Sequence, residues 1–201
     1  MKTDFYTLFT IIVLMGFVFF VILRQLGPTQ NKRIIDDSIE LLERKLGGAR
    51  GAYVPESRRF EAFQGNCTDP ELLRYMAEDI LAHCGIVPAD LAVETCEEEM
   101  GEHPAGTYSH RDGVSTIRIR VSRYARYNVV LAVLIHECMH YYLRHSGIGF
   151  SETRDNEILT DTATIYMGFY EYIYHGYIMV GYLRDSEIMY VKKKLAELRN
   201  I

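Results

Sequence analysis

The sequence feature that most constrains this chain is the string HECMH at residues 136–140, which lies inside the apolar run 129–143. On an α-helix, residues four apart lie above one another on the same face, so His136 and His140 can offer two imidazole nitrogens to one metal ion. Glu137 lies about 100° round the helix from His136, where its carboxylate sits beside the metal and can accept a proton from a metal-bound water. Neutral imidazoles suit zinc, so the string predicts a helical zinc site.

The residues around this string favour a metal site over a chance occurrence. Shuffling the sequence would produce the string roughly 0.02 times per chain. Its neighbours, which include Leu134, Ile135 and Met139, are apolar, so the helix is expected to be buried. Buried imidazoles and carboxylates need polar partners, and a shared metal ion supplies one to both histidines.

A third metal ligand is expected on the next helix. Gly147 and Gly149 end the first helix, and residues 151–153 (SET) have N-cap chemistry for a second one. Glu157 and Asp161 lie four apart and therefore share a face of that second helix. Across a short turn, Glu157 can face the histidine pair as a ligand, and Asp161 can hold a ligating histidine by its other ring N–H. The competing interpretation is a solvated acidic face.

Taken together, His136, Glu137 and His140 followed by Glu157 and Asp161 resemble the pattern of the gluzincin class of zinc metallopeptidases. The E-x-x-x-D part is similar to that of HtpX-like and CAAX-type membrane proteases and of the small minigluzincins. The metzincin pattern does not fit, because leucine and serine stand where it needs glycine and a third histidine. The resemblance implies that zinc is bound by the two histidines and the downstream glutamate. It also implies that the motif glutamate is the general base, and that a zinc-activated water hydrolyses peptide bonds.

The resemblance further implies an α+β fold with a zincin-like core. In such a core, a small antiparallel or mixed sheet packs on the motif helix and on the following glutamate-bearing helix. An extended protein or peptide substrate pairs with the edge of the sheet in folds of this kind. The strand expected at 115–121 comes just before the motif helix, and we expect it to be that edge.

An uncharged apolar run at residues 5–23 predicts a membrane anchor. Its 19 residues span roughly 28 Å as a helix, about the thickness of the hydrocarbon core of a bilayer. No small-x-small cleavage site follows, so residues 1–24 are interpreted as a single-pass anchor rather than a signal peptide. The basic residues Arg24, Lys32 and Arg33 after the run favour a cytoplasmic catalytic domain. A lipid bilayer is therefore an expected partner.

The rest of the chain divides into two parts by pattern. Residues 25–58 are interpreted as an amphipathic helix and a linker, and residues 59–201 as the zinc metalloprotease domain. Three flanking helices and three strands are predicted from periodicity and turn residues: helices at 31–46, 68–83 and 185–198, and strands at 91–94, 105–110 and 115–121.

Charge and composition exclude one class of partner and leave other functions open. The net charge of −5 gives no basic excess, so nucleic acid is not expected to bind. Tyr166 is the tyrosine nearest the motif and could donate a hydrogen bond to a reacting oxyanion, or could pack in the core. Two alternatives to a protease remain: a catalytically inactive, metal-stabilised membrane interaction protein, and a zinc hydrolase of a non-peptide amide.

Overall fold

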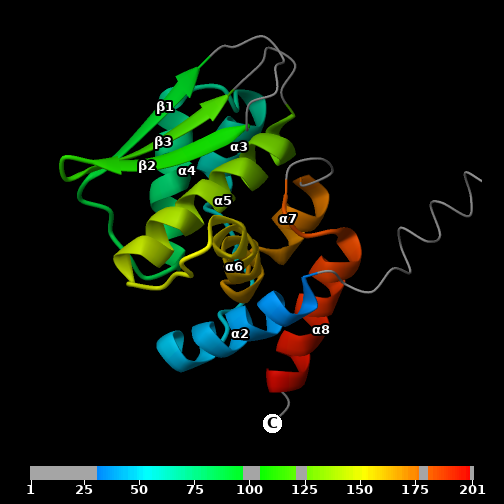
Figure 1. The fold of residues 1–201 in the computed structure, drawn as a ribbon. Coiled ribbons are helices and arrows are strands. Elements are labelled where there is room, and N and C mark those ends of the chain that lie inside the picture. The colour runs from blue at the N-terminus through cyan, green and yellow to red at the C-terminus, as the bar shows by residue number, and fades with distance from the viewer. Residues whose placement is uncertain (1–30, 97–104, 121–125, 177–180, 200–201) are drawn as a thin grey trace, which may run out of the picture.

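The computed structural model describes residues 31–96, 105–120, 126–176 and 181–199. These residues form an α+β fold with seven helices and one small sheet (Figure 1). In chain order the elements are α2 (Lys32–Leu46), α3 (Ser57–Gly65), α4 (Pro70–His83), β1 (Leu91–Cys96), β2 (Gly106–Arg111), β3 (Val114–Arg120), α5 (Tyr127–His145), α6 (Thr153–Tyr166), α7 (Tyr170–Gly176) and α8 (Asp185–Arg199).

The sheet is mixed, and the strand that was expected at its edge is its central strand. β2 and β3 form the expected antiparallel hairpin, in which Tyr108 lies opposite Ile117. β1 pairs in parallel with the other side of β3, so that Val93 also lies opposite Ile117. The prediction that residues 115–121 form the edge of the sheet is therefore wrong, because β3 has a partner on each side. Among the described strands, the edges are β1 and β2.

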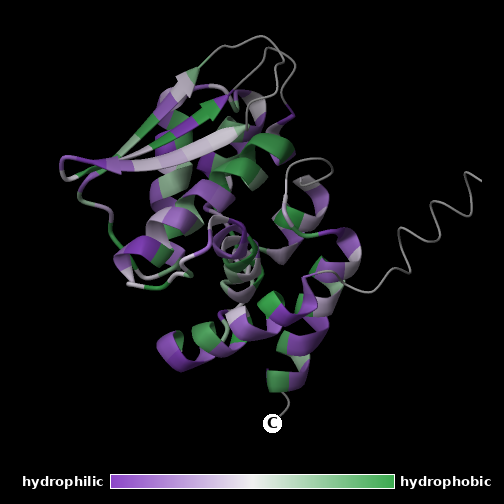
Figure 2. Cartoon of the chain, in the orientation of Figure 1, coloured by the Kyte–Doolittle hydropathy of each residue, from purple (hydrophilic) through white to green (hydrophobic). Residues whose placement is uncertain are grey.

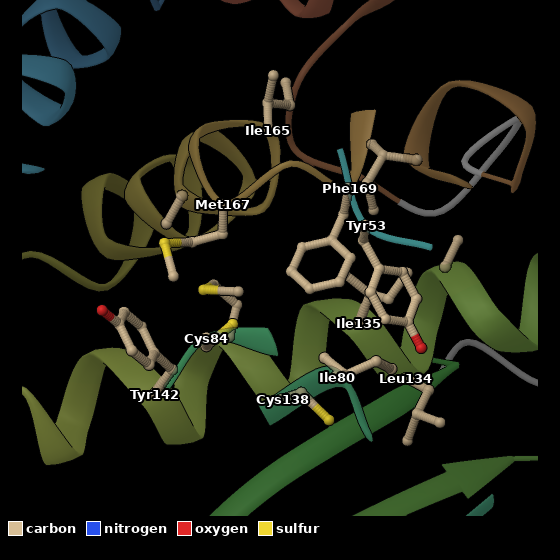
Figure 3. Packing of buried hydrophobic residues seen from close by; sticks show 14 of the residues in the cluster. Tyr53, Ile80, Cys84, Leu134, Ile135, Cys138, Tyr142, Ile165, Met167 and Phe169 are labelled. Carbon is tan, nitrogen blue, oxygen red and sulfur yellow. The ribbon is translucent and has the colours of Figure 1, made fainter. Parts of the chain in front are cut away.

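Helix α5 is the central element of the fold. It packs on β2 and β3 on one side and on α4, α6 and α7 on others. Most of its residues are buried, because it is apolar on nearly all sides. Figure 3 shows part of this core, where Ile135 and Cys138 of α5 lie near Ile80 of α4, near Cys84 just after that helix, and near the ring of Phe169.

Helices α2 and α8 lie on the far side of α6 from α5 (Figure 1). In Figure 2 both helices show hydrophobic and hydrophilic residues in alternation, which is the pattern of helices with one buried face. α2 is the predicted amphipathic helix, and it buries Ile35, Ile39 and Leu42. At its start, the backbone N–H and the side-chain amide of Asn31 donate to the buried carboxylate of Glu187 on α8, over 3.2 and 3.3 Å.

Two helices were not predicted from sequence. α3 is highly charged and buries only Phe63, so it has almost no apolar periodicity. α7 is a single short segment of seven residues inside the tyrosine-rich tract. In both cases the neighbouring elements, and not the local pattern, stabilise the helix.

The predicted membrane anchor at residues 1–24 lies outside the described residues. Within the described ranges, no helix combines the length and the apolar character needed to cross a bilayer.

Among the glycines that the structure describes, Gly168, after α6, has the closest approach to another part of the backbone. Its φ is +93°, and a Cβ there would lie 2.0 Å from the backbone oxygen of Gly51. We expect Gly168→Ala to lower the free energy of unfolding by about 3 kcal/mol or more, and the melting temperature by about 6–12 °C. Gly47→Ala is the control, because its φ is +73° but nothing lies within 4 Å. If both variants lost the same free energy of unfolding, the positive φ would explain the effect, and the contact with the backbone of Gly51 would not.

Candidate metal centre

The candidate site lies between α5 and α6, which are joined by a short turn at residues 146–152. The backbone N–H of Phe150 donates to Oδ1 of Asn156 over 3.2 Å, which ties this turn to the first part of α6. Gly147 ends α5 in a left-handed conformation with φ +62°. The result is that the second helix returns along the first, with its Glu157 side chain toward the histidines.

The three predicted ligand atoms lie close together. Nε2 of His136 and Nε2 of His140 lie 3.1 Å apart, and each lies 3.2 Å from Oε2 of Glu157. Around a tetrahedral zinc ion with bonds of 2.0–2.1 Å, ligand atoms are about 3.3 Å apart. The three atoms therefore have a spacing that suits a tetrahedral ion, and this group could hold a metal ion.

The electrostatics of the group also favour a cation. Burial would lower the pKa of His136, but hydrogen bonds to Asp161 and Glu157 outweigh it and raise the pKa to about 10. Burial would raise the pKa of Glu157, but hydrogen bonds from His136 and His140 lower it to about 2. Nδ1 of His136 donates to Asp161, so the raised pKa reports how strongly its surroundings favour a positive charge at Nε2. A divalent cation bound to Nε2 would supply that positive charge in place of a proton.

Both imidazoles are held so that Nε2 faces the other ligand atoms. Nδ1 of His136 donates to Oδ1 of Asp161 over 2.8 Å, as predicted. Nδ1 of His140 lies 3.3 Å from Oγ1 of Thr160, whose own hydroxyl donates to the backbone oxygen of Asn156. Oγ1 of Thr160 can therefore accept a hydrogen bond from Nδ1–H of His140. Its role was not predicted, although its position three residues after Glu157 places it on the same helix face.

Glu137 lies beside the three ligand atoms and against the sheet. Its side chain is buried, and a Cβ added to Gly106 at the start of β2 would lie 2.7 Å from its Oε1. Burial raises the pKa of Glu137, although the neighbouring His136 and His140 oppose this change. A carboxyl group with a raised pKa at this position can both accept and return a proton nearer to neutral pH.

The structure does not place Tyr166 at the site. Its side chain is fully buried, and its hydroxyl accepts a hydrogen bond from the backbone N–H of Gly48 over 3.0 Å. The alternative interpretation, packing in the core, is therefore correct. Two other tyrosines lie next to the ligands: the Tyr108 ring is 6.2 Å from that of His140, and the Tyr182 ring is 6.4 Å from that of His136.

Asp161 is expected to set the metal affinity of the site. In Asp161→Asn, one oxygen can still accept from His136, but the amide nitrogen then faces the backbone N–H groups of Tyr182 and Leu183, which now donate to Oδ2 over 2.7 and 3.1 Å. We expect Zn²⁺ to bind about 10- to 100-fold more weakly. The measurement is competition with a chelating dye.

Asp155→Asn, on the first turn of the same helix, is the control for this prediction. If both variants bound Zn²⁺ as tightly as the wild type, Asp161 would have no part in orienting His136.

Comparisons with protein-family models, with curated proteins and with solved structures find no match to this chain. Any function must therefore be argued from the geometry of the site and from the sequence.

Proposed function

We propose that this chain is a membrane-anchored zinc metallopeptidase that hydrolyses peptide bonds. The observation that carries the proposal is that the ligand atoms of His136, His140 and Glu157 lie close together, with the buried side chain of Glu137 beside them. Two histidines and one carboxylate are the ligands of one common class of catalytic zinc site, in which the fourth position stays open.

The donor set favours zinc over the harder cations. Mg²⁺ and Ca²⁺ prefer six or more oxygen ligands, whereas two imidazole nitrogens and one carboxylate suit a borderline cation. When bound, zinc supplies Lewis-acid chemistry and lowers the pKa of a coordinated water to about 7.

The chain's own residues supply the proton transfer. Glu137 is placed to take a proton from a water that attacks the peptide carbonyl, and to return it to the departing amine. Thr160 and Asp161 keep the two imidazoles in the orientation seen in the structure. The start of β2 lies against the side chain of Glu137, which is buried.

The edge strand β2 offers a binding surface for an extended peptide. Among the described strands it pairs only with β3, and this edge position supports pairing of its outer backbone groups with a peptide strand. Gly106 lies against Glu137, and Tyr108 lies beside His140. A peptide that pairs with β2 would therefore pass close to the metal ligands, which supports an amide substrate with an extended backbone.

The membrane part of the proposal rests on the sequence. The apolar run at 5–23 and the basic residues that follow support a single-pass protein with its catalytic domain in the cytoplasm. Retention in the membrane fraction after alkaline carbonate washing, and its loss when residues 1–24 are deleted, would support this location.

The decisive experiment combines metal analysis with peptide hydrolysis. Purified protein should contain about one zinc per chain and should cleave peptides from a mixed library, with cleavage abolished by a chelator and restored by Zn²⁺. Zinc without any hydrolysis would favour the inactive, metal-stabilised protein. Hydrolysis of small amides but of no peptide would favour the non-peptide hydrolase. The absence of any stoichiometric transition metal would contradict all three.

A further inference from the structure

Asp161 joins the metal ligands to a second segment of the chain. One of its oxygens accepts from Nδ1 of His136, and the other accepts from the backbone N–H groups of Tyr182 and Leu183. Asp161 is only 1% exposed, and Leu183 is buried in the core. The backbone of Tyr182 and Leu183 is therefore held next to the metal centre, although these residues lie 21 and 22 positions from Asp161 in sequence.

The side chain of Tyr182 is not needed for this attachment. Its ring lies nearly parallel to that of His136, at an interplanar angle of 18° and a centroid distance of 6.4 Å. The residue is nevertheless 53% exposed, so much of the ring faces solvent.

A second aromatic ring lies beside the other histidine, His140. Tyr108 projects from β2, and its ring is nearly parallel to that of His140, with an interplanar angle of 9°. Its hydroxyl lies 3.3 Å from Oγ of Ser115, within the sheet. Each imidazole therefore has one tyrosine ring beside it, Tyr108 from the edge strand beside His140 and Tyr182 beside His136.

We propose that Tyr182 is a specificity-determining residue, which favours peptides that place an aromatic or large apolar side chain beside His136. The inference deepens the proposed function and rests on it. A half-exposed aromatic ring offers apolar area and favourable ring geometry to such a side chain. An acidic side chain would lose hydration against the ring and would gain no apolar contact from it.

The test measures peptide binding without cleavage, in zinc-loaded protein that carries Glu137→Gln. The probes are fluorescein-labelled peptides that differ at one central position, which holds Phe, Leu, Ala or Asp, and binding is followed by fluorescence anisotropy. We expect the Phe and Leu peptides to bind about 3- to 10-fold more tightly than the Ala peptide. Adding Tyr182→Ala should remove most of this difference, whereas Tyr182→Phe should keep it. Zinc content should be unchanged in both, because the backbone holds the segment.

Tyr174→Ala is the matched control. Tyr174 is a tyrosine of similar exposure, 43%, whose ring contacts Tyr170 and His175 on α7 and none of the metal ligands. It should leave the peptide preference unchanged.

Wild-type cleavage of the same peptides gives a second readout and separates the two proposals. Tyr182→Ala should raise KM for the Phe and Leu peptides with little change in kcat. A preference that survives Tyr182→Ala, a preference that Tyr182→Phe also removes, or no peptide binding at all would overturn the inference. If Tyr182 controls binding but the wild type cleaves none of the peptides, the proposed function fails and the binding preference stands.

Discussion

Replacing Glu137 by Gln is expected to lower kcat/KM for peptide hydrolysis by about 10²- to 10⁴-fold, which is the usual contribution of a general base. Gln keeps the size of the side chain against Gly106 but cannot accept a proton. Because Glu137 is not one of the three converging ligands, the variant should still bind about one zinc per chain and melt close to the wild-type temperature. The measurement is the initial rate of peptide hydrolysis, together with the metal content of the same sample.

Glu152→Gln controls for the loss of a negative charge near the site, since Glu152 is an exposed residue just before α6. Its activity should remain within about twofold of the wild type. If Glu137→Gln cleaved peptides at the wild-type rate, another group would have to accept the proton. If it lost zinc together with activity, the result would report a damaged site and not a missing base.

Removing the metal is expected to have the largest effect on stability. An ion that binds the native state alone adds about 4 kcal/mol at a concentration 1,000 times its dissociation constant. For a chain of 201 residues this corresponds to a loss of about 8–16 °C in melting temperature on chelation. Zn²⁺ should restore both the melting temperature and hydrolysis, and Mg²⁺ should restore neither.

The variant His140→Ala should already melt at the lower temperature and should not respond to the chelator, because it lacks one of the three ligands. His175→Ala, which removes an exposed imidazole on α7, should behave as the wild type. A chelator response in His140→Ala equal to that of the wild type would show that the stabilising ion binds elsewhere.

The three residues that could bind a metal ion are predictable from sequence because each is linked to the next by local geometry. Helical periodicity brings His136 and His140 to one face, and a turn of a few residues leaves few ways for α6 to return other than along α5. The same periodicity brings Asp161 to the face of Glu157. The helix α2 and the hairpin of β2 and β3 were predicted for similar reasons, since their patterns are local.

The features that sequence did not predict depend on contacts between distant residues. A hairpin pattern shows that β2 and β3 are neighbours, but not that β1 covers the other side of β3. Tyr182 has no local signal, because its place beside His136 is set by a carboxylate 21 residues earlier. Tyr166 is close to the motif in sequence and yet points to α2, because successive residues of a helix face different directions.

The hydrogen bonds from Asn31, before α2, to Glu187, on α8, affect how fragments of this protein should be designed. A fragment that began at residue 59 would lack Asn31, so the carboxylate of Glu187 would lose two donors at a buried position. It would also lack α2, whose buried residues include Ile35 and Leu42, and would expose the surface of α6 that α2 contacts. Such a fragment would contain every proposed catalytic residue and would still be expected to aggregate during expression, whereas one that begins before Asn31 keeps the contact between the ends.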